Sequence, residues 1–383
     1  MGTRPEVIKL APVIAECNRR PEEFAVTVCF TGQHQDMLMA VARYFGIRPD
    51  IELQTMDPGQ SLPTLTARLL NALDNTLARV NPDCIIAQGD TCSVFCAALA
   101  AFYRRVPFVH VEAGLRTGDL SAPWPEEMNR RFATLTTRVH CAPTRRAVQN
   151  LLNEKIPSTD IYLTGNTVVD ALLETVERER ANRDHWESRY TQLGSSRVVF
   201  ITGHRRENHG KGLHDVCTAI CRLSRRFPDV EFVYPVHPNP NVSDIVHRQL
   251  AGCKSIHLLP PVSYPECVWL MDRATFIMTD SGGIQEEAPS LGKPVLVTRR
   301  STERPEAVES GAAMLVGTDV DVIVAAGSKL LDGNATPFKI TVNPYGDGHA
   351  AQRIADAIIT CLGKTCCTTA GTVAADYDCD KRT

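Results

Sequence analysis

The chain has 383 residues, of which 43% are apolar and 22% are charged. This is ordinary globular composition over a length of two or three domains, which excludes collagenous, disordered and mini-protein classes. The 41 Lys and Arg residues against 44 Asp and Glu residues leave a net charge of −3. Nucleic acid is therefore not an expected partner, because its phosphates call for an excess of positive charge.

No apolar run approaches the roughly 20 residues of a bilayer span, and the N-terminus shows no signal-peptide pattern. The 14 cysteines are too few for a disulfide scaffold. Neither CxxC nor HExxH occurs, and the Cys92/Cys96 and Cys217/Cys221 pairs suit core packing better than a zinc site. We expect a cytoplasmic protein with no membrane insertion and no metal.

Short β-branched runs alternate with helical stretches almost throughout, which is the pattern of βαβ units and parallel sheets. The predicted strands fall into two sets and so imply an α/β fold with two sheets. The first set is Ala25–Thr31, Cys84–Gln88, Phe108–Glu112, Arg138–Ala142 and Ile161–Thr164, and the second is Val198–Thr202, Glu231–Pro235, Ser255–Leu259, Thr275–Thr279 and Pro294–Thr298.

The segment GTRPE at residues 2–6 has the form of a glycine loop that enters a helix, predicted here as Val7–Cys17. Such loops normally follow a strand, whereas only Met1 precedes this one. The first strand, usually central in a doubly wound sheet, is thus predicted to be missing, which would leave strand edges unpaired. Either the given sequence is truncated or another segment fills the gap.

Three acidic residues occupy strand ends or a helix start in the first half. Asp90 follows the second predicted strand, Glu112 ends the next, and Glu126 begins a helix behind a proline. Ligands of open α/β sheets bind beyond the carboxyl ends of the strands. Glu126 alone is explained equally well as a complement to the helix dipole. For three acids in one cleft, a general acid/base role is the better prediction.

A charged stretch, Glu174–Ser196, interrupts the strand pattern and ends in Gly-Ser-Ser, which indicates a helix running into a surface linker. We predict an N-terminal domain at residues 1–170 and a C-terminal domain at 171–347. A helix at about 348–362 is predicted to pack back on the first domain. Residues 363–383 lack an apolar period and are predicted to form a disordered tail.

Basic motifs follow the first two strands of the second half. His204 and Arg205 come directly after Val198–Thr202, and His237 follows the next strand. A His beside Arg at a strand end suits contact with phosphate or protonation of a leaving group. A basic surface turn and a proline-shaped loop are the simpler alternatives.

Ser281, Gly282 and Gly283 follow the strand Thr275–Thr279 and begin a helix, where backbone N–H groups can bind a diphosphate. A capping Ser with a tight-turn glycine explains the same residues. One turn later, a carboxylate of the Glu286-Glu287 pair could accept hydrogen bonds from ribose or sugar hydroxyls. Phosphate contacts could also come from nearby arginines, namely Arg299, Arg300 and Arg304.

Taken in order, these motifs resemble the bacterial non-hydrolysing UDP-N-acetylglucosamine 2-epimerases, from Gly2 to about Leu362. The matching segments are GTRPE at 2, GQH at 32, GDT at 89, HVEAGLRTGD at 110, PEEMNR at 125, TGN at 164, TGHRREN at 202, PVHPNP at 235, DSGGIQEEAPSLGKPVLV at 280, TERPE at 302 and NPYGDG at 343. No GxGxxG, Walker A, nucleophile-elbow or kinase motif competes with this interpretation.

The resemblance implies a GT-B-like architecture, with two Rossmann-like domains around a nucleotide-sugar cleft, and a homodimer. It implies reversible C2 epimerisation of UDP-GlcNAc to UDP-ManNAc without a cofactor, by elimination of UDP to 2-acetamidoglucal and re-addition. The product would supply cell-surface polysaccharide synthesis.

By motif, the resemblance also assigns the site residues. The catalytic candidates are Asp90, Glu112, Glu126 and His204, and the substrate-binding candidates are Arg4, Lys9, Ser281, Gly282, Gly283, Glu287 and Arg304. An adjoining pocket for UDP-GlcNAc as activator has as its candidates Gln33, Arg68, Arg205 and His237.

Three alternatives stay open at this point. A hydrolysing epimerase would release UDP and free ManNAc, and a GT-B glycosyltransferase would share the architecture. A nucleotide-sugar-binding protein without activity would follow from the missing strand. Product analysis distinguishes them.

Overall fold

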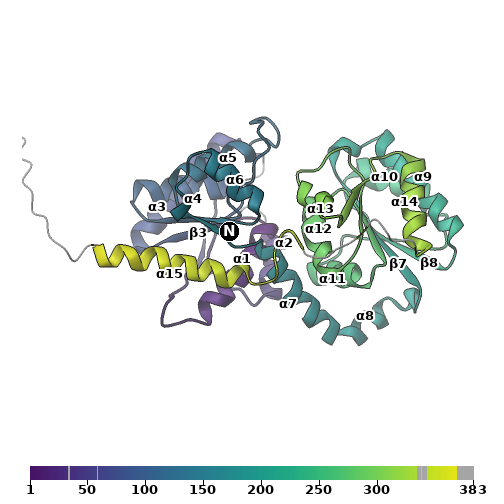
Figure 1. Ribbon diagram of the computed structural model, residues 1–383, viewed down its shortest axis with the longest axis horizontal. Helices are drawn as coiled ribbons and strands as arrows, with labels where there is room; N and C mark the ends of the chain where they lie inside the picture. Colours follow the sequence, from purple (N-terminus) through teal and green to yellow (C-terminus); the bar gives the residue numbers. More distant parts are fainter. Residues whose placement is uncertain (33–34, 58, 334–337, 339–342, 369–383) are drawn as a thin grey trace, which may run out of the picture.

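The computed structural model describes residues 1–32, 35–57, 59–333, 338 and 343–368. Two lobes lie side by side, each with a parallel sheet covered by helices (Figure 1). The predicted α/β fold with two Rossmann-like sheets is therefore confirmed. Among the described helices, none combines the length and the apolar character needed to cross a membrane.

The first domain is built from twelve alternating helices and strands. They are α1 (Arg4–Asn18), β1 (Cys29–Phe30), α2 (Gln35–Tyr44), β2 (Ile51–Glu52), α3 (Leu62–Val80), β3 (Ile85–Gln88), α4 (Cys92–Tyr103), β4 (Phe108–Val111), α5 (Glu126–Thr136), β5 (Thr137–Ala142), α6 (Arg145–Asn153) and β6 (Ile161–Leu163). Then α7 (Thr167–Ala181) and α8 (Arg183–Arg189) lead to the second lobe (Figure 1).

The second domain continues the alternation with a longer sheet. Its elements are β7 (Arg197–Thr202), α9 (Lys211–Arg226), β8 (Val230–Pro235), α10 (Pro240–Leu250), β9 (Ile256–Leu259), α11 (Tyr264–Arg273), β10 (Phe276–Thr279), α12 (Gly282–Glu287), β11 (Val295–Val297), α13 (Pro305–Glu309), β12 (Ala313–Leu315) and α14 (Val320–Leu331). The final helix is α15 (Ala350–Thr368), and short 3₁₀ turns occupy Ser158–Asp160, Thr191–Leu193, Arg206–Asn208 and Ala288–Leu291.

The second sheet has the order β12-β11-β10-β7-β8-β9, and all of its pairs are parallel. The first domain instead divides into a four-stranded sheet, β3-β4-β5-β6, and a separate pair, β1-β2. At the edge of β1, Met1 donates its amino group to the Cys29 carbonyl, and its own carbonyl accepts from the Thr31 amide. These two hydrogen bonds follow the pattern of a parallel ladder. Met1 therefore pairs with β1 at the position where the sequence predicted a missing strand.

Several predicted boundaries differ from the structure. The strand predicted from Ala25 shortens to β1, and the short strands β2 and β12 were not predicted. Helix α15 continues past residue 362, where its end was predicted, to Thr368. The predicted disordered tail stays a prediction, and residues 369–383 lie outside the described residues. The predicted domain limits, 1–170 and 171–347, stay predictions.

Side-chain hydroxyls fix where several helices begin. Ser61, Thr91 and Thr144 each precede a helix and accept a hydrogen bond from the backbone N–H three residues later. Each cap satisfies one of the amide donors left free in the first helical turn, which contributes about 1 kcal/mol. Thr91 has a further consequence, because its helix begins directly after Asp90 and so sets the position of that carboxylate.

The final helix closes one face of the first sheet. Ile354 and Ile358 of α15 are buried against Val109 and Val139 of the central strands, together with side chains of α1. Each such burial contributes about 1.5–3 kcal/mol. Residues near the C-terminus therefore complete the core of the first domain (Figure 1).

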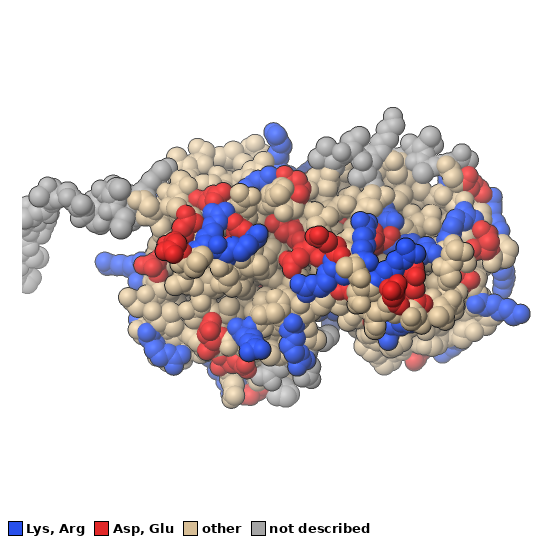
Figure 2. Space-filling view, turned by 90° about the horizontal axis from the view of Figure 1, so that it is seen from below, with Lys and Arg blue, Asp and Glu red and all other residues tan. Residues whose placement is uncertain are grey.

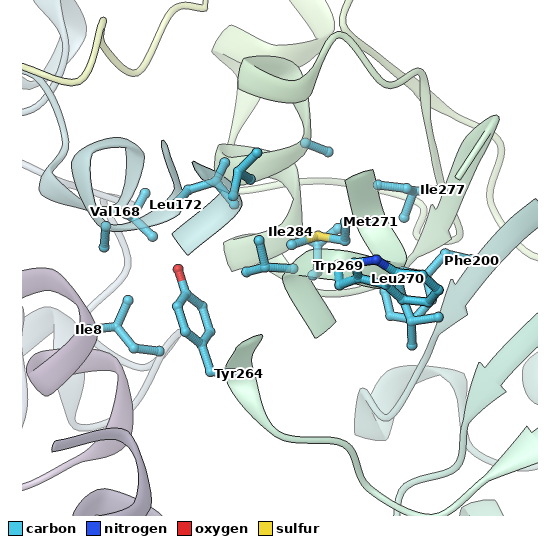
Figure 3. Packing of buried hydrophobic residues seen from close by; sticks show 14 of the residues in the cluster. Ile8, Val168, Leu172, Phe200, Tyr264, Trp269, Leu270, Met271, Ile277 and Ile284 are labelled. Atoms are coloured by element: carbon cyan, nitrogen blue, oxygen red, sulfur yellow. The ribbon is translucent and has the colours of Figure 1, made fainter. Parts of the chain in front are cut away.

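A continuous apolar cluster crosses from one domain to the other. Figure 3 shows Tyr264, the first residue of α11, reaching towards Ile8 of α1 and towards Val168 and Leu172 of α7. All four side chains are buried. Around Tyr264 the junction between the lobes is thus packed as closely as a protein interior, and such packing allows little relative movement of the two domains.

Candidate active site

The register of β3 and β4 places two of the predicted acids side by side. Gln88 pairs with Val111 in this parallel ladder, so Asp90 and Glu112 leave the same edge of the sheet. The charges of Glu112 and Glu126 both reach Asp90 and contribute to raising its pKa, after burial, which is the main cause. The structure therefore brings the three predicted acids to one edge.

Three neighbouring side chains hold Asp90 and the preceding Gly89. Arg130 places Nη2 2.6 Å from its Oδ2, and the Asn129 side chain donates to its backbone carbonyl at 2.9 Å. His110 Nε2 lies 2.7 Å from the Gly89 carbonyl. Since a carbonyl only accepts, His110 carries a proton on Nε2. Burial lowers the pKa of His110 to about 4, so the ring is neutral. Burial raises the pKa of Asp90 to about 6, despite the opposing charge of Arg130.

Glu112 is buried in a left-handed backbone conformation, with φ at +67°. This conformation is unfavourable for a residue with a side chain, and such strain occurs most often at functional sites. Its carboxylate accepts from Lys9 Nζ at 2.5 Å and from Asn166 Nδ2 at 3.2 Å, and also from the Gln88 amide. These donors fix the carboxylate at the carboxyl end of β4.

In the second domain, Asp280 organises the loop that contains His204. Strands β7 and β10 are neighbours, so the loops that follow them leave the sheet together. The buried Asp280 carboxylate accepts from the backbone amides of His204, at 3.0 Å, and Arg205, at 2.9 Å. Asn208 Nδ2 adds a third donor at 3.3 Å. His204 and Arg205 are thereby held beside the start of α12.

Two arginines converge on Gly282, the first residue of α12. A Cβ at this position would lie 3.8 Å from both Arg205 Nη2 and Arg304 Cζ. Arg205 Nε is buried and has no hydrogen-bond partner among the described residues. Ser281 and Gly283 complete the turn, which leaves a glycine surface beside two guanidinium groups. This is the arrangement expected of a phosphate site.

His204 stacks on His237, with ring centroids 5.4 Å apart. Burial lowers the pKa of His204, and the charges of Arg205 and Arg4 act in the same direction. Both rings are partly exposed at the edge of the second sheet. A neutral imidazole there can donate a hydrogen bond to a phosphate oxygen or relay a proton.

The two domains meet in a buried group of charges. Lys9 of α1 lies 2.5 Å from Glu112 and 3.2 Å from Glu286 of α12, and Arg304 pairs with the other oxygen of Glu286. Burial and the neighbouring Glu286 raise the pKa of Glu287 to about 8, so that Glu287 is protonated at neutral pH. Figure 2 shows acidic and basic side chains interleaved around the join of the two lobes.

The activator candidates are only partly brought together. Arg205 and His237 lie beside His204, whereas Arg68 is exposed on α3 and pairs with Asp57. Gln33 lies outside the described residues. In the part of the chain that the structure describes, no group of three His, Cys, Asp or Glu side chains could hold a metal ion.

Sequence reasoning did not predict how the candidate residues are held in place, although it named Glu286 as a possible acceptor from ribose or sugar hydroxyls. Asn166, Arg130, Asp280 and Glu286 all touch a predicted site residue or bridge two of them. Each lies inside a motif that the sequence analysis singled out, so the motifs gave a signal. The contacts themselves depend on which loops meet, and the linear spacing does not contain that information.

Comparison with known proteins shows the family. The sequence model of the family described as UDP-N-acetylglucosamine 2-epimerase matches residues 15–359. The chain belongs to this family. The UDP-N-acetylglucosamine 2-epimerase of Yersinia pestis is 48% identical over 363 residues, covering 93% of this chain and 96% of the relative. The enzyme of that name from Escherichia coli strain K12 is 46% identical with the same coverage.

Solved structures of epimerases have the same architecture. The UDP-GlcNAc 2-epimerase of Neisseria meningitidis, solved with bound UDP-GlcNAc, superposes with a TM-score of 0.87 at 42% identity, covering 94% of this chain and 98% of that one. The Methanocaldococcus jannaschii enzyme, solved with UDP-GlcNAc and UDP, gives 0.77 at 31% identity, again covering 94% and 98%. The GT-B-like arrangement and the assignment to the isomerases are thereby confirmed.

Proposed function

We propose that this epimerase interconverts UDP-GlcNAc and UDP-ManNAc by elimination of UDP and re-addition, with Asp90, Glu112 and Glu126 as its acid/base groups. The observation that supports this most is the junction of the domains. There, Glu112 at the end of β4 shares Lys9 with Glu286 of α12, and the first residue of α12, Gly282, lies beside Arg205 and Arg304. A proton-transfer site thus adjoins a diphosphate site.

In the first half of the proposed reaction, a carboxylate removes the C2 proton of the sugar. The C–H electron pair forms the C1–C2 double bond, and the C1–O bond to the diphosphate breaks. The leaving UDP gains negative charge that Arg205, Arg304 and the start of α12 stabilise. In the return step a protonated acid delivers hydrogen to the opposite face of C2, and UDP adds back to C1. No net oxidation occurs, so the stoichiometry needs no redox cofactor.

Asp90 suits a group that alternates between base and acid. Burial raises its pKa to about 6, close to neutral pH, where both protonation states are accessible. Protonated Glu287 can donate a hydrogen bond to a ribose or phosphate oxygen without placing a second negative charge there. Arg4 is exposed at the start of α1, and its charge reaches Glu287 and His204, which supports its proposed role as a substrate-binding residue.

We further propose that the protein is a homodimer through α4 and α5. These two helices pack against each other. Near its C-terminal end each exposes two large apolar side chains, Phe102 and Tyr103 on α4 and Phe132 and Leu135 on α5. Leu135 is 77% exposed. An exposed apolar surface of this kind on a folded protein commonly binds another protein surface.

The first test is proton NMR of the purified chain with UDP-GlcNAc in D2O. Deuterium at C2 together with accumulating UDP-ManNAc is the expected result. Free ManNAc and UDP would instead assign a hydrolysing epimerase. A folded, UDP-binding sample with no exchange at C2 would assign a nucleotide-sugar-binding protein and contradict the proposal.

A further inference from the structure

Glu286 holds a position that the proposed chemistry does not explain. It lies on α12 of the second domain, its side chain is 2% exposed, and the same donors that hold Glu112 of the first domain also hold Glu286. Lys9 Nζ bridges the two carboxylates at 2.5 and 3.2 Å, and Asn166 Nδ2 bridges them at 3.2 Å each. The two acids are therefore joined twice across the domain boundary.

The Asn166 bridge has only one orientation. Its Oδ1 accepts from the Val168 amide at 3.1 Å and so caps α7, and its own backbone amide donates to the Tyr345 carbonyl at 2.6 Å. With the oxygen committed to the cap, the NH2 group must face the carboxylates. Tyr345 lies in the segment that leads back to the first domain, so this contact sits where the chain crosses between domains.

Glu286 neutralises both cations at this junction. The buried Lys9 and the 17% exposed Arg304 contribute two positive charges, Glu112 and Glu286 contribute two buried negative ones, and Glu303 lies 3.8 Å from Arg304. Arg304 pairs with Glu286, which leaves Lys9 to be shared between both carboxylates. Without the Glu286 charge, the ion pairs left among the described residues would be Lys9 with Glu112 and Arg304 with Glu303 at 3.8 Å, so both cations would be less well neutralised, which is unfavourable for charges held away from water.

We propose that Glu286 is a positioning residue that fixes the Glu112 carboxylate relative to the UDP-binding domain, through the shared donors Lys9 and Asn166. The inference rests on the proposed function, because it assumes that Glu112 acts on a substrate held by the second domain. Glu286 itself needs no contact with the sugar. Its effect is to order an acid on one domain with respect to a ligand on the other, and misplacement of an acid by about 1 Å can lower the rate about 100-fold.

Because Lys9 is shared by Glu112 and Glu286, the positioning role of Glu286 should affect how turnover depends on pH. Burial lowers the pKa of Lys9, but the charges of Glu112 and Glu286 more than offset this, so its pKa lies above the ordinary value. If the positive charge of Lys9 is needed, turnover falls as pH rises through that pKa. Losing the Glu286 charge would move this fall to lower pH. The charged and titratable groups around Lys9 are Glu112, Glu286, Arg304, Asp90 and Glu287.

The test compares Glu286→Gln with the wild-type protein in the C2-exchange assay and in UDP titrations. We expect kcat to fall about 10- to 100-fold, the Kd for UDP to change by less than about threefold, and the basic limb of the kcat profile to move to lower pH. Glu286→Asp keeps the charge but is one methylene shorter. It serves as a second variant should the Gln form fail to fold, and we expect it too to lower kcat.

A matched control removes a buried carboxylate elsewhere. Glu179 on α7 is buried and accepts from Tyr44 Oη at 2.6 Å and from Trp186 Nε1 at 2.8 Å. Glu179→Gln should leave kcat and its pH profile unchanged. If the wild-type protein exchanges C2 while folded Glu286→Gln and Glu286→Asp keep its kcat and pH profile, the positioning role is overturned and the function stands. A folded wild-type protein that exchanges nothing at C2 would overturn both.

Discussion

Replacing Asp90 by Asn should remove most of the turnover and yet make the protein more stable above pH 6. Burial raises the pKa of Asp90 to about 6, from 3.8 for an ordinary Asp. Between these values the unfolded chain releases a proton that the folded chain keeps. The free energy of unfolding therefore falls as pH rises through this window and stays lower above it. Asn cannot ionise and escapes this loss.

The size of the effect follows from the shift. About two pKa units correspond to about 3 kcal/mol at 1.36 kcal/mol per unit. Depending on whether one domain or the whole chain unfolds as a unit, this raises Tm by about 4–8 °C. Turnover should fall about 10²- to 10⁴-fold, the usual contribution of an acid/base group, with only a modest loss of UDP affinity.

The assay is thermal unfolding of both proteins at pH 8 and at pH 4. The two should melt at similar temperatures at pH 4, where neither carries a charge at this position in the folded state, and should separate at pH 8. An Asn variant that melts at or below the wild-type temperature at pH 8 would refute the reasoning. It would show that the ion pair with Arg130, at 2.6 Å, outweighs the cost of burying the Asp90 charge.

Four further outcomes are expected. Glu112→Gln should reduce C2 exchange about 10²-fold or more while UDP still binds, and unchanged turnover would remove Glu112 from the chemistry. His204→Ala should shrink the rise in Tm that UDP causes, and an identical rise would place the diphosphate elsewhere. Gly114→Ala should lower the free energy of unfolding by at least about 2 kcal/mol more than Gly118→Ala does. Both glycines have positive φ, but only at Gly114 would an added Cβ clash with the backbone of α6. Equal Tm values for the two variants would contradict this. Leu135→Asp should convert dimer to monomer in light scattering, and a dimer that persists would exclude this surface as the interface.

The fold could be predicted because its signals are local. Alternating β-branched runs and helical stretches identify parallel α/β structure, and polar residues just after strands identify the ligand edge. On this basis Asp90 and Glu112 are expected at one edge, and the register of β3 and β4 brings them there. The short strands β2 and β12 are not predicted from the sequence, because two or three residues are too few to show the alternation of apolar and polar side chains that identifies a strand.

The contacts inside the site could not be predicted in the same way. Lys9 and Glu286 are 277 positions apart, and no spacing rule links them. Asn166 looks like an ordinary helix cap, and only the meeting of the domains turns its free amide towards two carboxylates. The site's positioning residues therefore emerged only from the three-dimensional structure.

The sequence by itself determined the α/β alternation, the strand-end motifs and the family that they indicate, since these depend on residue type and short spacing. Tertiary structure alone decided the protonation of the site. Asp90 and Glu287 have ordinary carboxyl groups, and their pKa values rise to about 6 and about 8 because distant segments exclude water from them. Burial is a property of the whole fold, and it is what makes these particular acids suitable for moving protons near neutral pH.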